Sequence, residues 1–154
     1  MKISGNIVDV FTRSIYKGII YIEGSRIARI ERADVEEDVF ILPGLIDAHI
    51  HIESSMLTPV SFAQAVVPHG TIGVVADPHE IANVLGVEGV DFMIKSGRKT
   101  PLYFWFGAPS CVPATTFETS GATINVKQVE ELLLRENILY LSEMMNWPGV
   151  VFND

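Results

Sequence analysis

From Leu45 onward, short apolar segments that favour strands alternate with segments that favour helices. The expected strands are 45–51, 71–76, 102–106 and 138–141. A helical segment follows each of the first three strands, and the chain ends shortly after the fourth. Such alternation predicts a parallel sheet with helices packed on it. The expected fold class is therefore α/β, as either a small open sheet or half of a barrel.

Capping patterns mark where the three helical segments begin: Thr58-Pro59, Asp77-Pro78 with Glu80, and Asn125 with Gln128. We expect the first helix to end near Pro68, because proline cannot continue a helix. The second helical segment is expected to reach about Ser96, with a break near Gly86. A long loop, 107–123, precedes the third helix.

Residues 1–42 have a different pattern. Isoleucine and valine recur in short runs, separated by turn residues and by the acidic run 34–38. This pattern predicts three or four antiparallel strands. A sheet of that size needs a partner face to bury. We therefore expect two domains, 1–42 and 43–154.

The chain of 154 residues is too short for a complete eight-stranded β/α barrel, which needs roughly 250 residues. Its composition is nevertheless apolar, because 48% of residues are hydrophobic and only 19% are charged, against the usual value of about 25% charged. A short chain has a high ratio of surface to volume and should be more polar than average. The composition predicts a protein whose surface is partly covered by other polypeptide.

Charge and hydropathy exclude several classes of partner. A net charge of -8 with 11 basic residues argues against a nucleic-acid backbone as partner, since that affinity comes from clustered Lys and Arg. The chain has neither an apolar run long enough to span a membrane nor an export signal at its start. Cys111 is the single cysteine, which excludes an internal disulfide. We expect a cytoplasmic protein without a membrane partner.

Two histidines at the end of the first expected strand form the sharpest candidate site. His49 and His51 should point to the same face, because side chains two apart on a strand do so. Two neutral imidazoles at this spacing can converge on one divalent ion. The alternative is two polar residues on a half-exposed strand. The apolar neighbours Ile50 and Ile52 favour the metal site, because unpaired imidazoles on a buried strand would cost free energy.

Polar residues follow other strands as well. Glu143 comes just after the fourth strand, and Asp77 and His79 follow the second. In a barrel, the carboxyl ends of the strands converge on one mouth, where active sites are built. The alternative for Glu143 is a solvated carboxylate without a functional role, and helix capping alone is enough to explain Asp77. Because a cap does not require a histidine, His79 is a candidate metal ligand or a neighbour of the site.

The remaining candidates have simpler explanations. Glu53 follows His51 and could either hydrogen-bond a ligand or form a polar turn. Glu80 completes the capping pattern of the second helical segment. His69 precedes its strand and is expected at the opposite end of the sheet. Cys111 has no histidine in its own segment, so we expect an unreactive thiol.

The segment Leu42–Glu53 resembles the first barrel strand of the amidohydrolase superfamily. It contains the pattern Pro-Gly-x-Ile-Asp-x-His-x-His that many members share. Four other segments are similar to the bacterial and archaeal adenine deaminase family within that superfamily: 52–59, 74–84, 109–114 and 141–146. The resemblance extends over essentially the whole chain.

This resemblance implies metal-dependent hydrolysis of adenine to hypoxanthine and ammonia. It also implies a fold in which 1–42 contributes strands of a small β-sandwich and 43–154 the first four strands of a β/α barrel. The implied metal ligands are His49, His51 and Glu143, with Glu143 in the bridging position that many relatives give to a modified lysine. Manganese or ferrous iron is the implied ion, and zinc also suits these ligands.

The same resemblance places four further residues near the metal. Asp77 and His79 belong to a motif typical of the family, and they are additional ligands or neighbours of the ligands. Glu80 and Glu53 are expected in the same shell.

Members of the family have chains several times longer. Their remaining ligands and acid/base residues come from the fifth, sixth and eighth strands, so the acid/base residues are unassigned here. We expect the N-terminal part of such an enzyme, weakly active alone, with adenine as substrate and either a homo-oligomer or a complementing C-terminal chain as partner. The alternatives are another amidohydrolase, acting on a cyclic amide or a different purine, and a non-catalytic module whose exposed sheet edge pairs with another chain.

Overall fold

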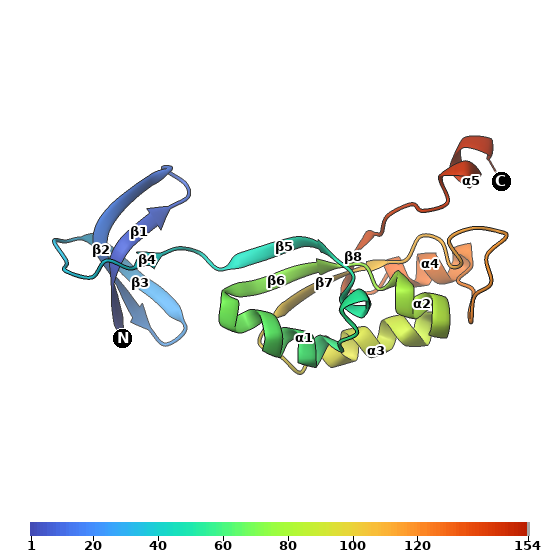
Figure 1. The fold of residues 1–154 in the computed structure, drawn as a ribbon, viewed down its shortest axis with the longest axis horizontal. Helices are drawn as coiled ribbons and strands as arrows, with labels where there is room; N and C mark the ends of the chain where they lie inside the picture. The colour runs from blue at the N-terminus through green and yellow to red at the C-terminus, as the bar shows by residue number, and fades with distance from the viewer. Residues whose placement is uncertain (154) are drawn as a thin grey trace. The chain divides into compact units, whose positions relative to one another are not determined.

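The computed structural model describes residues 1–153, so the last residue of the expected range 43–154 lies outside it. The chain divides into two compact units, Met1–Gly44 and Leu45–Asp154 (Figure 1). Each unit is described by itself below. Within the described residues, no helix is both long and apolar enough to cross a membrane.

The first unit is a four-stranded sheet in the order β3-β2-β1-β4. Its strands are β1 (Lys2–Asp9), β2 (Ser14–Glu23), β3 (Arg26–Arg32) and β4 (Phe40–Ile41). The antiparallel prediction is confirmed for β1, β2 and β3. It is wrong for β4, which pairs parallel with β1. The acidic segment before β4 brings the chain back to the edge of β1 in the same direction, and the side chains of Ser4 and Asn6 bind carboxylates of that segment.

Only a small core forms within this unit. Ile7 and Ile20 are buried, whereas several other apolar residues are mostly exposed: Val10, Phe11, Ile15, Ile27, Phe40 and Leu42. The described residues 1–44 form one sheet rather than two facing sheets. This unit therefore has an apolar surface that its own residues do not cover. Small sheets are marginally stable without a packed face.

The second unit is built on a parallel sheet in the order β5-β6-β7-β8. The elements are β5 (Leu45–Ile50), η1 (Ile52–Ser55), α1 (Pro59–Val66), η2 (Val67–His69), β6 (Thr71–Ala76), α2 (His79–Leu85), α3 (Val87–Gly97), β7 (Tyr103–Ala108), α4 (Val126–Leu133), β8 (Ile138–Leu141) and α5 (Trp147–Phe152). The α/β class and the parallel sheet are therefore confirmed. The sheet is open within the described residues, with β5 and β8 at its edges.

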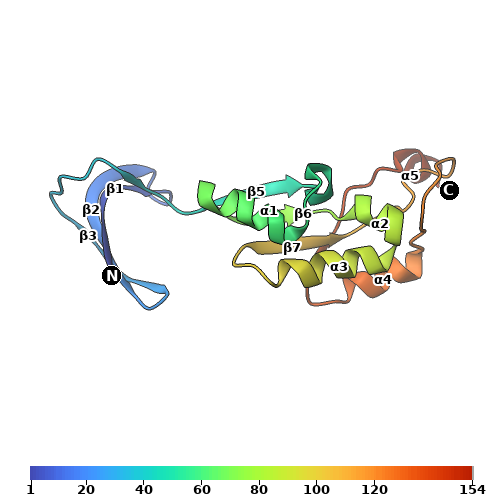
Figure 2. The same cartoon turned by 60° about the horizontal axis from the view of Figure 1, so that its bottom comes forward.

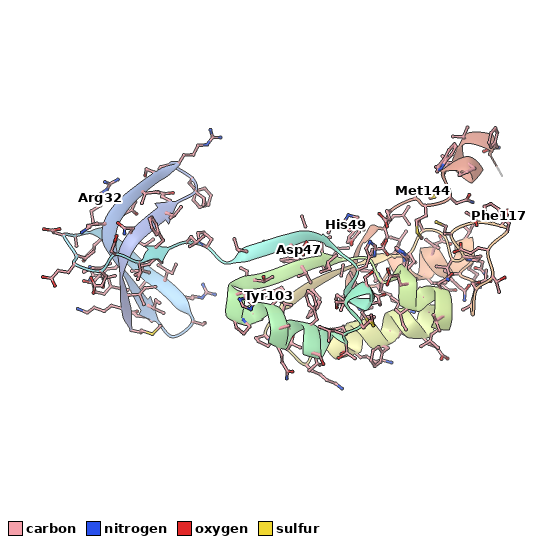
Figure 3. All side chains as sticks on the ribbon, in the orientation of Figure 1. Arg32, Asp47, His49, Tyr103, Phe117 and Met144 are labelled. Carbon is pink, nitrogen blue, oxygen red and sulfur yellow. The ribbon has the colours of Figure 1, made fainter. Side chains whose placement is uncertain are left out.

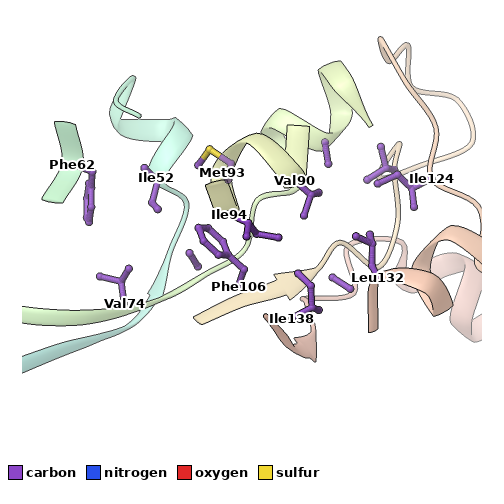
Figure 4. Close-up of a cluster of buried hydrophobic side chains, with 14 of the residues drawn as sticks. Ile52, Phe62, Val74, Val90, Met93, Ile94, Phe106, Ile124, Leu132 and Ile138 are labelled. Carbon is purple, nitrogen blue, oxygen red and sulfur yellow. The ribbon is translucent and has the colours of Figure 1, made fainter. Parts of the chain in front are cut away.

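The hydrophobic core lies between this sheet and its helices. Helices α1 and α3 lie on the same side of the sheet (Figures 1 and 2). The close-up in Figure 4 shows side chains of the core between the sheet and the helices, including Ile52, Phe62, Val74, Val90, Met93, Phe106, Leu132 and Ile138. This packing fixes the strands of the sheet and therefore the positions of their carboxyl ends.

Two of the three capping predictions are confirmed. Thr58 accepts a hydrogen bond from the amide of Ser61 at the start of α1. Asn125 and Gln128 complete a reciprocal capping box at the start of α4. The break at Gly86 is also confirmed, because that residue has a φ of +61° and separates α2 from α3.

The capping prediction for Asp77 is wrong. Helix α2 begins at His79, with Pro78 at its N-cap and no hydrogen bond from a capping side chain. The Asp77 carboxylate instead binds the ring of His79. A local pattern favoured the cap, but the side chain has a stronger partner in the imidazole.

Leu132 should carry a large share of the stability that α4 contributes. Its side chain is 0% exposed, whereas that of Leu134 at the end of the helix is 80% exposed. We expect Leu132→Ala to lower the free energy of unfolding by about 2–5 kcal/mol, because it leaves a cavity. The matched change Leu134→Ala should cost less than about 0.5 kcal/mol. Urea unfolding followed by circular dichroism measures both, and equal losses would contradict the assigned core.

Candidate metal centre

Polar side chains from three strand ends meet at one edge of the parallel sheet. His49 lies near the end of β5 and His51 directly follows it. Asp77 and His79 follow β6, and Glu143 lies just past β8. Figure 3 labels His49 at this edge. Because parallel strands place their carboxyl ends together, residues up to 94 positions apart meet here.

The side chains approach within a few ångströms of one another. The Nε2 atoms of His49 and His51 are 3.1 Å apart. The carboxylate of Glu143 lies 3.5 Å from His49 Nε2 and 3.4 Å from His51 Nε2. One potential ligand atom from each of His51, Asp77, His79 and Glu143 lies within 4.8 Å of the others. These residues form one compact cluster, with the more exposed His49 against its side.

Asp77 holds two of the imidazoles through separate groups. Its backbone carbonyl is 3.0 Å from Nδ1 of His51, and its Oδ2 is 3.0 Å from Nδ1 of His79. A carbonyl oxygen can only accept a hydrogen bond, so His51 carries its proton on Nδ1. In the neutral ring, Nε2 of His51 then carries a lone pair, which lies 3.1 Å from Nε2 of His49 and 3.4 Å from the carboxylate of Glu143.

The electrostatics of the cluster favour protons on the groups around Asp77. The hydrogen bond to Asp77 raises the pKa of His79, although burial of the ring opposes the shift. The negative charges of Asp77, Glu143 and Glu80 raise it further. Burial raises the pKa of Tyr140 to about 12, so its phenol stays neutral at physiological pH.

The donor atoms of this cluster fit a divalent cation. The Nε2 lone pair of His51 faces a carboxylate oxygen of Glu143, and two such electron-rich atoms repel each other unless positive charge lies between them. The Oδ1 atom of Asp77 is buried and has no hydrogen-bond partner within residues 1–153. Imidazole nitrogen and carboxylate oxygen together suit manganese, ferrous iron or zinc.

Glu53 and Glu80 lie outside this cluster and have other partners. Oε1 of Glu80 accepts a hydrogen bond of 2.5 Å from the hydroxyl of Ser54. Oε1 of Glu53 accepts one of 3.1 Å from the amide of Ile81. Burial raises the pKa of Glu53, and the charge of Glu80 adds a smaller contribution in the same direction.

Two other candidates are not among the four clustered residues. His69 is exposed in η2, directly before β6, and so lies toward the opposite end of that strand. Cys111 is half-buried, and its sulfur lies 3.4 Å from the hydroxyl of Ser110.

Ser110 and Gly107 support the position of Glu143, and neither was expected from the sequence. The hydroxyl of Ser110 donates a hydrogen bond of 2.6 Å to the backbone carbonyl of Glu143. A Cβ atom at Gly107 would lie 2.7 Å from the ring of Tyr140 and closer still to the hydroxyl of Ser142. A glycine near the end of a strand was the only available signal, since it can mark a close approach of neighbouring atoms.

A cavity of about 240 Å³ opens beside the cluster. Its walls are formed by α2, the loop after β7 and the segment after β8, with the lining residues His79, Glu80, Asn83, Cys111, Ala114, Glu118 and Met145. The cavity places polar side chains around a space next to the candidate metal ligands.

Comparisons with known proteins show which sequences this chain resembles. The family model described as "Amidohydrolase family" matches residues 40–154. Adenine deaminase from Sulfurovum sp. (strain NBC37-1) is 54% identical over 154 residues, which are 100% of this chain and 29% of that relative. Adenine deaminase from Salinibacter ruber is 55% identical over 150 residues, which are 97% of this chain and 28% of that relative. The chain thus spans less than a third of the length of these relatives.

Replacing Gly107 should disturb the strand end that carries Glu143. We expect Gly107→Ala to lower the free energy of unfolding by about 1–3 kcal/mol, because the new methyl group overlaps Ser142 and Tyr140. Ser142→Ala alone should change it by less than about 0.5 kcal/mol, since the hydroxyl has no hydrogen-bond partner among residues 1–153.

The double variant Gly107→Ala/Ser142→Ala should recover part of that loss, because the closest overlap is removed. Urea unfolding of all four proteins measures the coupling. Strictly additive losses would show that the hydroxyl of Ser142 does not limit the space at Gly107.

Proposed function

The chain belongs to the amidohydrolase family, and from this premise we propose that it supplies the metal-binding part of an enzyme that hydrolyses adenine to hypoxanthine and ammonia. The observation that carries the proposal is the cluster of His51, Asp77, His79 and Glu143, whose potential ligand atoms lie within 4.8 Å of one another. The relatives named adenine deaminase support adenine as the substrate.

The proposed enzyme completes both sheets with further polypeptide. In this proposal, β5 to β8 are the first four strands of a β/α barrel, and residues 1–42 contribute strands to a small β-sandwich. Three observations support it: the spatial order of the parallel strands follows the chain order, β5 and β8 are open edges, and the relatives are more than three times as long.

We assign His49, His51 and Glu143 as metal ligands. Asp77 either ligates through its free Oδ1 or orients the two imidazoles, and His79 is a further ligand or a neighbour of the ligands. Manganese or ferrous iron is the preferred ion and zinc an alternative, because the donors are nitrogen and oxygen without a thiolate. When bound, such an ion makes water a nucleophile at neutral pH.

The residues of the chain then orient the reaction. Asp77 keeps a proton on Nδ1 of both His51 and His79, so Nε2 of each neutral ring is unprotonated, and that of His51 lies 3.4 Å from the carboxylate of Glu143. The cavity beside His79 is the proposed space for the purine. Deamination also requires proton transfer to the ring and to the leaving amine, and we assign those acid/base residues to the part of the enzyme beyond this chain.

The open sheet edges support a second possibility for the partner. Unpaired parallel strands are templates for association, so the chain either pairs with a complementing C-terminal polypeptide or forms a homo-oligomer. A non-catalytic interaction module would use the same edges, and another amidohydrolase acting on a cyclic amide or a different purine would use the same ligands. We propose the cytoplasm as the compartment, in keeping with a single cysteine.

The purified chain should bind a divalent ion through the cluster. Cobalt(II) is a suitable probe, because its visible spectrum reports the ligands. We expect His51→Ala and Glu143→Ala to weaken cobalt affinity by at least about 10-fold. The control His69→Ala should leave it unchanged, since His69 is exposed and outside the cluster. Equal binding by all four proteins would exclude this cluster as the metal site.

A hybrid enzyme tests the activity. This chain replaces the corresponding segment of the Sulfurovum adenine deaminase, and ammonia release from adenine is measured with added manganese. We expect turnover by the hybrid and a loss of at least about 100-fold on His51→Ala or Glu143→Ala, with His69→Ala as the control. The isolated chain should turn over little, because half a site is not preorganised.

An active isolated chain with the turnover of the hybrid would refute the assignment of acid/base residues to the missing part. A hybrid that folds and binds metal but acts only on a cyclic amide or another purine would favour the other amidohydrolase.

A further inference from the structure

Helix α2 begins without a cap from its own sequence. Pro78 occupies its N-cap position and makes no capping hydrogen bond through a side chain. The Asp77 carboxylate, which the local pattern favours as a cap, is bound to the ring of His79. Because the first amides of a helix have no partners within the helix, α2 needs an acceptor from another part of the chain.

Glu53 provides that acceptor from the turn after β5. Its Oε1 accepts the hydrogen bond of 3.1 Å from the amide of Ile81, 28 residues later in the sequence. Glu53 is half-buried, which shields this hydrogen bond from water. The adjacent Ser54 donates the 2.5 Å hydrogen bond to Glu80. Two neighbouring residues of η1 therefore hold two neighbouring residues in the first turn of α2.

These contacts join the two segments that carry the imidazoles. Residues 50–54 include His51, and residues 77–81 include His79. The backbone also joins them, because the amide of Asp77 donates to the carbonyl of Ile50 at 3.1 Å. The contact of Glu53 differs from this backbone bond in one respect: a substitution can remove it without changing any residue of the metal cluster.

We propose that Glu53 is a positioning residue, whose carboxylate caps α2 from the turn after β5 and thereby sets the position of His79 relative to His51. The consequence for metal binding rests on the proposed function, whereas the cap itself does not. Glu53 acts through a single acceptor oxygen, so a glutamine at this position retains the function and an alanine loses it.

Amide hydrogen exchange on the metal-free chain tests the cap. We expect Glu53→Ala to speed exchange at Ile81 by about 2- to 30-fold, the range that follows from losing a helix cap. Exchange in β6 and α3 should not change. Glu53→Gln should exchange as the parent does. The matched control is Glu88→Ala, which removes an exposed carboxylate from the first turn of α3.

Cobalt titration tests the effect on the metal cluster. We expect Glu53→Ala to weaken cobalt affinity by about 10- to 100-fold and to change the visible spectrum of the bound ion. Glu53→Gln and Glu88→Ala should match the parent in both. If Glu53→Ala does not fold, Ser54→Ala removes the neighbouring hydrogen bond between the same two segments, and it should weaken cobalt affinity in the same direction but by less.

The two measurements separate this inference from the proposed function. A parent chain that binds no cobalt contradicts the metal site, but exchange at Ile81 still decides whether Glu53 caps α2. Unchanged exchange at Ile81 in Glu53→Ala would overturn the proposal. The proposal would also be wrong if Glu53→Gln behaved like Glu53→Ala, since the acceptor oxygen would then not be what matters.

Discussion

The buried Asp77 joins the parts of the candidate site, because three of its groups are bonded at once. Its amide donates to the carbonyl of Ile50, its carbonyl accepts from His51, and its carboxylate accepts from His79. With 2% of its surface exposed, it holds these partners where water competes little. The end of β5 and the start of α2 are thereby fixed around one residue, and Glu53 adds a hydrogen bond at the far end of the same junction.

This arrangement concentrates lone pairs and negative charge at the carboxyl edge of the sheet. Three imidazole rings and the carboxylates of Asp77 and Glu143 converge there, and such a group is stable only with protons or a cation among its members. His51 and His79 each donate a hydrogen bond from Nδ1 to Asp77, which fixes the proton of each neutral ring on Nδ1. The same hydrogen bonds that stabilise the fold therefore select the tautomers that suit a metal ligand.

Much of this fold and site could be predicted, and the failures have a common cause. The strands of the second unit and the caps at Thr58 and Asn125 depend on residues a few positions apart. The parallel pairing of β4, the partner of Asp77 and the contact of Glu53 with Ile81 each depend on spatial neighbours. Periodicity and capping rules describe local preference, and they do not register a competing partner brought near by the fold.

The amino-acid pattern alone establishes an α/β chain with a parallel sheet, and it indicates His49, His51 and Glu143 as candidate ligands, because strand alternation and strand-end position are local properties. The tertiary structure decides what the other acidic residues do. Asp77 accepts hydrogen bonds from two imidazoles instead of capping a helix, and Glu53 accepts the bond from the first turn of α2. The physical reason is that each carboxylate binds the donor that packing brings within about 3 Å. The spacing of residues close in the sequence does not determine which donor that is.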